Sequence, residues 1–163
     1  MTIKEHLMEW LKDCSRLVIL GIGNPLRGDD SVGLKIAWRL RGKLPKNVKI
    51  IRGGVTPENF IGKIRYIKPS HVLLIDAAHF GGKPGEIKLI YPEEISGVAI
   101  STHVIPLYIL ADLIHEEMGA KVILLGIEPK DLSLGAKISP EIREAIERSV
   151  ELIIDVIRSL RIN

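Results

Sequence analysis

The sequence has few of the features that mark secreted or membrane proteins. It contains a single cysteine, Cys14, so no disulfide can form within the chain, which fits a reducing compartment. No uncharged stretch approaches the roughly 18–20 residues that a membrane-spanning helix needs. Residues 1–15 are too polar for the apolar region of a secretory signal. We therefore expect a cytoplasmic protein that does not act at a membrane.

Glutamine is absent and aromatic residues make up only 4% of the chain. Isoleucine, lysine and glutamate are abundant instead, a bias that favours a thermophile as the source. The 23 Lys and Arg residues exceed the 20 acidic residues slightly, giving a net charge of +3. The basic residues are scattered without interleaved aromatics, which disfavours nucleic-acid binding. With 163 residues, 46% of them hydrophobic, residues 1–163 are expected to form one domain.

Apolar runs alternate along the chain with segments of helical spacing. Short continuous apolar runs are typical of buried parallel strands, and apolar residues three and four positions apart indicate helices. Strands are expected at 17–22, 48–51, 71–77, 86–91 and 121–127, and helices at about 3–14, 31–44, 56–66, 104–118 and 140–158. The link between the third and fourth strands is too short for a helical crossover, so these two are not a standard parallel pair. The alternation predicts a three-layer α/β sandwich.

The first expected strand ends in a glycine-rich turn that carries two acids. The spacing of Gly23 and Gly28 matches that of a phosphate-binding loop, but Asp29 stands where that loop has its lysine. With Asp29 and Asp30 in place of a bound anion, the turn should attract cations. The simpler alternative for either residue is an N-cap at the start of the next helix.

Three polar residues follow or precede apolar elements at one edge of the expected sheet. Asp30 follows the first strand, Asp76 closes the third, and His103 precedes a helix. Ligands of open α/β sheets bind beyond the carboxyl ends of the strands. Each residue alone has a structural alternative, as a cap, a loop contact or a structural histidine. Together, two carboxylates and an imidazole predict an incomplete shell around a divalent metal ion.

Substrate-binding residues are expected at the same edge. Gly53 and Gly54 form either a plain turn or a place where a peptide backbone approaches closely. Glu128 follows the last strand, and Asn24 lies in the turn before Asp30, so we assign all four to substrate binding. The motifs G-x-S-x-G and H-E-x-x-H do not occur, and Cys14 precedes the first strand. Serine, cysteine and zincin peptidase mechanisms are therefore disfavoured.

The segment at 21–33, Gly-Ile-Gly-Asn-Pro-Leu-Arg-Gly-Asp-Asp-Ser-Val-Gly, resembles the signature of the hydrogenase maturation endopeptidases. These enzymes trim the C-terminus of a [NiFe]-hydrogenase large subunit. The resemblance continues at 53–59, 74–77, 84–87, 101–103 and 125–129. The paired aspartates and the Thr-Pro-Glu-Asn stretch make the chain most similar to the hydrogenase 3, or formate hydrogenlyase, type. The helix expected at 3–14 is not part of the usual family pattern.

The resemblance implies a phosphorylase/hydrolase-like α/β/α sandwich. Its five-stranded, mostly parallel twisted sheet would have the order 2-1-3-5-4, with strand four antiparallel. The resemblance also places the nickel-recognising residues at Asp30, Asp76 and His103, with Asp30 and Asp76 as catalytic carboxylates. The first acid is glutamate in some members, so an aspartate here shortens its reach to the metal.

The implied activity is removal of the C-terminal peptide from a large-subunit precursor after nickel insertion. The nickel would be supplied by the precursor, with no organic cofactor, and we expect a monomeric enzyme. Either the metal polarises the scissile bond or a water, or a carboxylate such as Asp30 acts as general base. The alternatives are a nickel-dependent chaperone that does not cut, and a metal-dependent amidohydrolase of small molecules.

Overall fold

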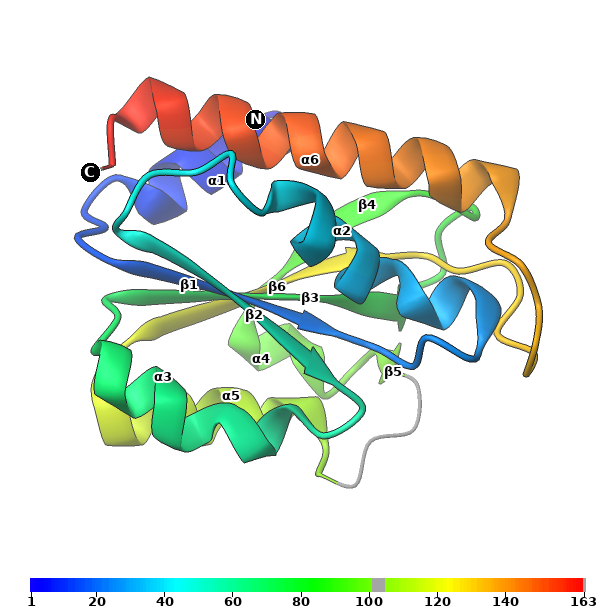
Figure 1. Cartoon of the computed structure of the whole chain (residues 1–163), viewed down its shortest axis with the longest axis horizontal. Coiled ribbons are helices and arrows are strands. Elements are labelled where there is room, and N and C mark those ends of the chain that lie inside the picture. The colour runs from blue at the N-terminus through cyan, green and yellow to red at the C-terminus, as the bar shows by residue number, and fades with distance from the viewer. Residues whose placement is uncertain (101–104, 163) are drawn as a thin grey trace.

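The computed structural model describes residues 1–100 and 105–162, and it places a twisted six-stranded sheet between two layers of helices (Figure 1). The strands are β1 (Leu17–Ile22), β2 (Val48–Gly54), β3 (His71–His79), β4 (Ile87–Ile90), β5 (Ala99–Ile100) and β6 (Lys121–Ile127). The α-helices are α1 (Ile3–Leu11), α2 (Val32–Leu40), α3 (Ile61–Ile67), α4 (Pro92–Ile95), α5 (Leu107–Met118) and α6 (Pro140–Leu160), and the 3₁₀ turns are η1 (Gly28–Ser31) and η2 (Pro57–Phe60).

The strand order is β2-β1-β3-β6-β4, with β5 attached to the end of β3. Strands β2, β1, β3 and β6 run parallel, and β4 is antiparallel to β6. Since β6 is the fifth of the expected strands, the predicted order 2-1-3-5-4 is confirmed. The short connection after β3 leaves no room for a crossover helix, so β4 returns antiparallel at the sheet edge. The two-residue strand β5 and the single-turn helix α4 were not predicted.

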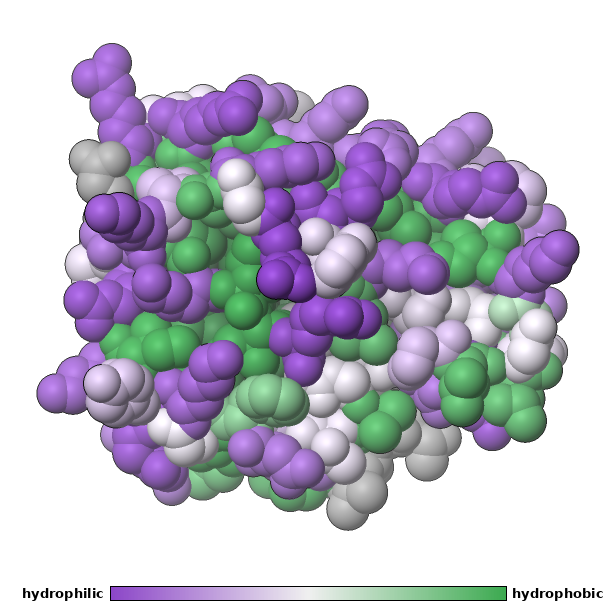
Figure 2. Space-filling view, in the orientation of Figure 1, coloured by the Kyte–Doolittle hydropathy of each residue, from purple (hydrophilic) through white to green (hydrophobic). Residues whose placement is uncertain are grey.

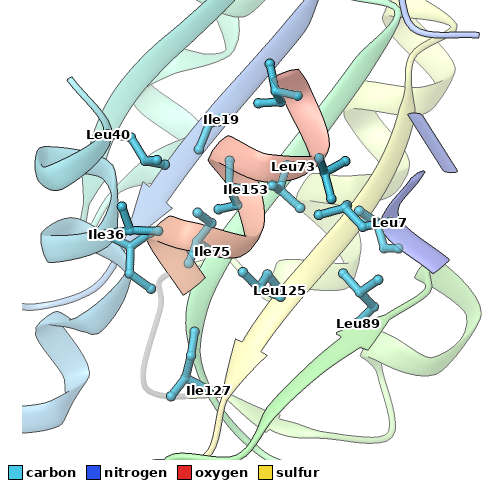
Figure 3. Packing of buried hydrophobic residues seen from close by; sticks show 14 of the residues in the cluster. Leu7, Ile19, Ile36, Leu40, Leu73, Ile75, Leu89, Leu125, Ile127 and Ile153 are labelled. Atoms are coloured by element: carbon cyan, nitrogen blue, oxygen red, sulfur yellow. The ribbon is translucent and has the colours of Figure 1, made fainter. Parts of the chain in front are cut away.

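Side chains that alternate along the strands divide the core into two layers. Leu73 and Ile75 of β3 pack with Ile36 and Ile153 beneath α2 and α6 (Figure 3). Leu74 belongs to the other cluster, on the side of α3 and α5. Because helices cover both faces, β1 is buried throughout and β3 is buried up to His79, which explains the long apolar runs in their sequences. No helix within the described ranges is long and apolar enough to cross a bilayer.

Helix α1 packs on the α6 side of the sheet. It begins with a capping box, in which Thr2 accepts a hydrogen bond from the Glu5 backbone and the Glu5 carboxylate accepts one from the Thr2 backbone. Its buried residues Leu7 and Leu11 join the core, and the helix contacts α6 and the edge strand β4. The helix therefore covers apolar surface next to β4 that would otherwise meet water.

Two glycines let α2 begin in direct contact with the ends of β1 and β3. A Cβ atom on Gly33 would lie 2.2 Å from the Ile75 carbonyl oxygen and 2.4 Å from that of Ile22. A Cβ atom on Gly21 would lie 2.5 Å from the Gly33 carbonyl oxygen. All of these neighbours are backbone atoms, which cannot rotate away as a side chain can. The contact places η1, and Asp30 within it, at the carboxyl edge of the sheet.

We predict that Gly33→Ala lowers the free energy of unfolding by about 2 kcal/mol or more, since the added methyl group forces α2 away from the sheet. The matched control is Gly62→Ala in α3, where no described heavy atom outside the adjacent residues and the backbone of the same helix lies within 4 Å of the new Cβ. This control should leave stability unchanged or raise it by up to about 1 kcal/mol. Urea unfolding of both variants measures the difference. If the two variants had the same free energy of unfolding, the close packing of Gly33 against the strands would be contradicted.

Candidate functional site

Asp30 is held in η1 by the loop that precedes it. Its side chain is buried, and Oδ2 accepts a hydrogen bond of 2.9 Å from the Asn24 backbone N–H. The Asn24 side chain accepts in turn from the Leu26 N–H at 2.9 Å, which stabilises the loop as an Asx turn. The backbone passes so close that a Cβ on Gly23 would lie 2.0 Å from the Asp30 carbonyl oxygen. The position of Asp30 is therefore set by the backbone around it.

Asp76 lies in β3, the strand next to β1, and is completely buried. Its Oδ1 accepts a hydrogen bond of 2.8 Å from the Ala77 N–H. By strand alternation its side chain belongs to the face of Leu74 and Ala78, towards α3 and α5. Since η1 contacts β3, the segments that carry Asp30 and Asp76 are neighbours at the carboxyl edge of the sheet.

The third predicted ligand, His103, lies outside the described residues. Within residues 1–100 and 105–162, no group of three or more His, Cys, Asp or Glu side chains is placed to hold a metal ion. The described part of the chain thus supplies two candidate oxygen donors, Asp30 and Asp76, on adjacent segments. A nickel site made of these residues and His103 stays a prediction.

Asp29, the other acid of the turn, faces a different part of the molecule. Its Oδ1 accepts a hydrogen bond of 2.8 Å from the Ser139 N–H. Its Oδ2 accepts from the Ser139 hydroxyl at 2.7 Å and from the N–H groups of Lys130 and Asp131 at 3.0 and 2.9 Å. It is not an N-cap, since the N-cap residues of η1 and α2 are Arg27 and Ser31. The interpretation of the paired acids as one cation-attracting group is wrong for Asp29, which instead holds the loop between β6 and α6.

Glu128 follows β6 at the same edge, and its carboxylate is engaged within the protein. Oε1 accepts hydrogen bonds of 2.9 Å from the Phe80 and Gly82 N–H groups, and Oε2 lies 2.8 Å from His79 Nδ1. Burial acts to raise the pKa of Glu128, but the bonds from Phe80, His79 and Gly82 outweigh it and hold the pKa below its usual value. Glu128 therefore holds the turn after β3, and its assignment to substrate binding stays a prediction.

The two glycines assigned to substrate binding end β2, which extends further than predicted. Gly54 has a φ of +64°, a conformation that glycine adopts without strain, and its carbonyl accepts a 3.0 Å bond from the Gly23 N–H. Apart from the adjacent residues of the chain, no described heavy atom lies within 4 Å of a Cβ built at Gly54, whereas at Gly53 the Leu20 side chain would be 3.0 Å away. Open space therefore lies beside Gly54, next to the turn that carries Asp30.

A serine, a histidine and an aspartate form a chain of contacts at the opposite edge of the sheet, which no sequence motif indicated. Ser70 Oγ lies 2.8 Å from His71 Nδ1, and His71 Nε2 lies 3.3 Å from Asp13 Oδ1. Burial lowers the pKa of His71, which favours its neutral form. The Ser70 hydroxyl also contacts the backbone of Ser15 and Arg16, and so joins the starts of β1 and β3. We interpret this group as structural, because its hydroxyl already has several partners in the fold.

Comparisons by sequence and by structure both find that this chain is similar to hydrogenase maturation proteases. A family model described as hydrogenase maturation protease, HycI, matches residues 35–156. A putative hydrogenase maturation protease of Methanocaldococcus jannaschii is 36% identical over 168 aligned residues, covering 98% of this chain and 99% of that protein. The hydrogenase 3 maturation protease of Escherichia coli K12 is 37% identical over 131 residues, covering 80% of this chain and 83% of that protein.

A solved structure has the same fold over nearly the whole chain. The crystal structure of the [NiFe] hydrogenase maturation protease HycI from Thermococcus kodakarensis superimposes with a TM-score of 0.86 at 39% identity. The superposition covers 94% of this chain and 99% of that one. The alignment with the Methanocaldococcus protein covers 98% of this chain, so it extends into α1 (Ile3–Leu11). At least part of this helix therefore has a counterpart in that relative.

We predict that Asp29→Asn lowers the free energy of unfolding by about 2–4 kcal/mol, because the amide nitrogen cannot accept the buried N–H bonds that one carboxylate oxygen accepts now. Asp131→Asn is the matched control, since it removes the same charge from an exposed side chain that keeps an oxygen for the Ser133 N–H. The control should stay within about 0.5 kcal/mol of the parent protein. Urea unfolding tests both, and an equal effect of the two substitutions would contradict the role given to Asp29.

Proposed function

Because this chain belongs to the hydrogenase maturation protease family, we propose that it removes the C-terminal peptide of a [NiFe]-hydrogenase large-subunit precursor after nickel has been inserted. The similarity to the hydrogenase 3 maturation protease of E. coli favours a precursor of the hydrogenase 3 type. The precursor is then both substrate and partner, and the nickel is its cargo.

In this proposal Asp30, Asp76 and His103 recognise the nickel. The observation that carries it is the position of two buried carboxylates on adjacent segments, each oriented by a backbone N–H. Ile100, the last described residue before the segment that contains His103, pairs with Ala78, two residues beyond Asp76. Carboxylate oxygens and an imidazole nitrogen are suitable ligands for nickel. Away from water their attraction to a cation is stronger, because the local dielectric constant is lower.

Hydrolysis requires a water activated beside the scissile carbonyl group. Asp30 is suited to accept the proton of that water as general base, while the precursor's nickel polarises the carbonyl group. The open space beside Gly54 gives an extended peptide a path to the Asp30 turn. Holding the peptide next to the carboxylates also makes the reaction effectively intramolecular.

The burial of the two carboxylates suggests how the metal controls cleavage. Asp30 exposes 3% of its surface and Asp76 none, so nickel carried by a precursor reaches them only if the surrounding groups move. Coordination of the ion provides the free energy for that movement. A precursor without nickel lacks this compensation, and the reactive arrangement does not form.

We predict that Asp76→Asn and His103→Ala each abolish processing of a nickel-loaded precursor. Asp76→Asn should keep the fold, because the amide oxygen can still accept the Ala77 N–H bond. Asp155→Asn, which removes an exposed carboxylate from α6, serves as the control and should process at the parent rate. Mass spectrometry of the precursor before and after incubation gives the result. Normal processing by either site variant would rule out this assignment.

We also predict that metal-free precursor remains uncut, whereas the nickel-loaded form loses one C-terminal peptide. The same mass measurement separates the alternatives. Tight binding without loss of mass would indicate a chaperone, and an inert protein would favour an amidohydrolase of small molecules. Cleavage at similar rates with and without nickel would remove the checkpoint from the proposal.

A further inference from the structure

A cavity of about 560 Å³ lies between α2 and α6, on the side of the sheet opposite to α3 and α5. Its wall includes Gly28 and Ser31 of the η1 turn, together with α2, the loop before α6, and α6 itself. Gly28 and Ser31 belong to the same four-residue turn as Asp30. The cavity is therefore continuous with the segment that carries one of the candidate nickel ligands.

Positive charge dominates this cavity. Lys35 and Arg39 reach it from α2, Lys137 from the loop, and Arg143 from α6. The one acid among its lining residues, Glu147, is bound by both terminal nitrogens of Arg39. Arg39 and Glu147 are therefore neutral as a pair, so the positive charge of the cavity comes from Lys35, Lys137 and Arg143. The side chains of Lys35 and Lys137 are exposed. The sequence did not reveal this group, because Lys35 and Lys137 are about one hundred residues apart.

An exposed tryptophan adjoins the cations. Trp38 lines the same cavity and is 54% exposed, and the guanidinium groups of Arg41 and Arg52 lie 4.8 and 5.4 Å from the centre of its ring. Figure 2 shows hydrophilic side chains with apolar ones between them over the face where α2 and α6 lie. Tryptophan and arginine are enriched in protein interfaces, where a flat apolar ring and a planar cation make strong contacts.

We propose that this basic surface, defined by Lys35, Trp38, Arg39, Lys137 and Arg143, docks an acidic segment of the large-subunit precursor. The inference rests on the proposed function, since it takes the precursor as the partner. Charge complementarity supports an acidic occupant, and the shared η1 turn places that occupant next to the Asp30 site. A nucleic acid is disfavoured, because a single aromatic side chain adjoins the cations and they line a cavity rather than a stripe.

Docking here does not involve nickel, so it can be measured apart from cleavage. The probe is the metal-free precursor, whose dissociation constant is determined with the parent enzyme and two charge-reversed variants. The Lys35→Glu/Lys137→Glu variant reverses two charges of the basic surface. The control variant, Lys4→Glu/Lys63→Glu, changes the net charge by the same amount, but on α1 and α3. All four lysines are exposed.

We expect the Lys35→Glu/Lys137→Glu variant to bind about tenfold or more weakly at about 50 mM salt, mainly through slower association. The difference from the parent should shrink at about 300 mM salt, because exposed charges are then screened. The Lys4→Glu/Lys63→Glu variant should bind within about twofold of the parent. Equal binding by both variants, or equal loss in both, would overturn the docking surface.

The milder pair Lys35→Gln/Lys137→Gln keeps the test valid if charge reversal disturbs folding, which thermal unfolding checks. It should weaken binding by about threefold or more, and parent-like binding would overturn the proposal. The proposed function is tested separately, by cutting of nickel-loaded precursor with the parent enzyme. A parent enzyme that binds through the basic surface but never cuts refutes the protease proposal alone. If the parent enzyme cuts normally and the substitutions at Lys35 and Lys137 leave precursor binding unchanged, the docking surface alone is refuted.

Discussion

The contact of Gly33 with the carbonyl groups of Ile22 and Ile75 sets the geometry on which the candidate site depends. Without a side chain at this position, α2 starts directly against the ends of two neighbouring parallel strands. The η1 turn is then held at the carboxyl edge, and Asp30 comes next to the strand that carries Asp76. A larger residue would separate the helix from the sheet and, with it, one carboxylate from the other.

Buried acids at this edge have different tasks, which depend on their hydrogen-bond donors. Asp29 accepts bonds from a loop distant in sequence, and Glu128 accepts bonds from the turn after β3. These two acids hold the loops around the edge in place. Asp30 and Asp76 receive backbone bonds from their own neighbourhood, which orient the carboxylates on rigid elements. Such backbone bonds fix the direction of these two carboxylates, which is what a precise site requires of its side chains.

The proposed activity and the proposed docking surface divide recognition into two parts. In these proposals the basic surface between α2 and α6 would contribute affinity for the precursor whether or not nickel is present. The buried carboxylates would contribute only when an ion is delivered to them. An enzyme built in this way can bind its substrate early and cut it late, since the two sources of binding free energy are separate. The η1 turn belongs to both, so precursor held at the surface is also near the site.

Local sequence patterns were sufficient to predict much of the fold of this protein. Apolar runs located the central strands, and strand ends located Asp30 and Asp76. The short link between the third and fourth strands excluded a standard parallel pair, and the antiparallel direction of the fourth strand followed from the family resemblance. These features depend on neighbours in sequence, where periodicity and spacing are direct evidence. The different orientations of Asp29 and Asp30, and the meeting of Lys35 with Lys137, came only from the folded chain. Their partners lie about one hundred residues away, and long-range packing, which spacing along the chain does not encode, decides which distant groups meet.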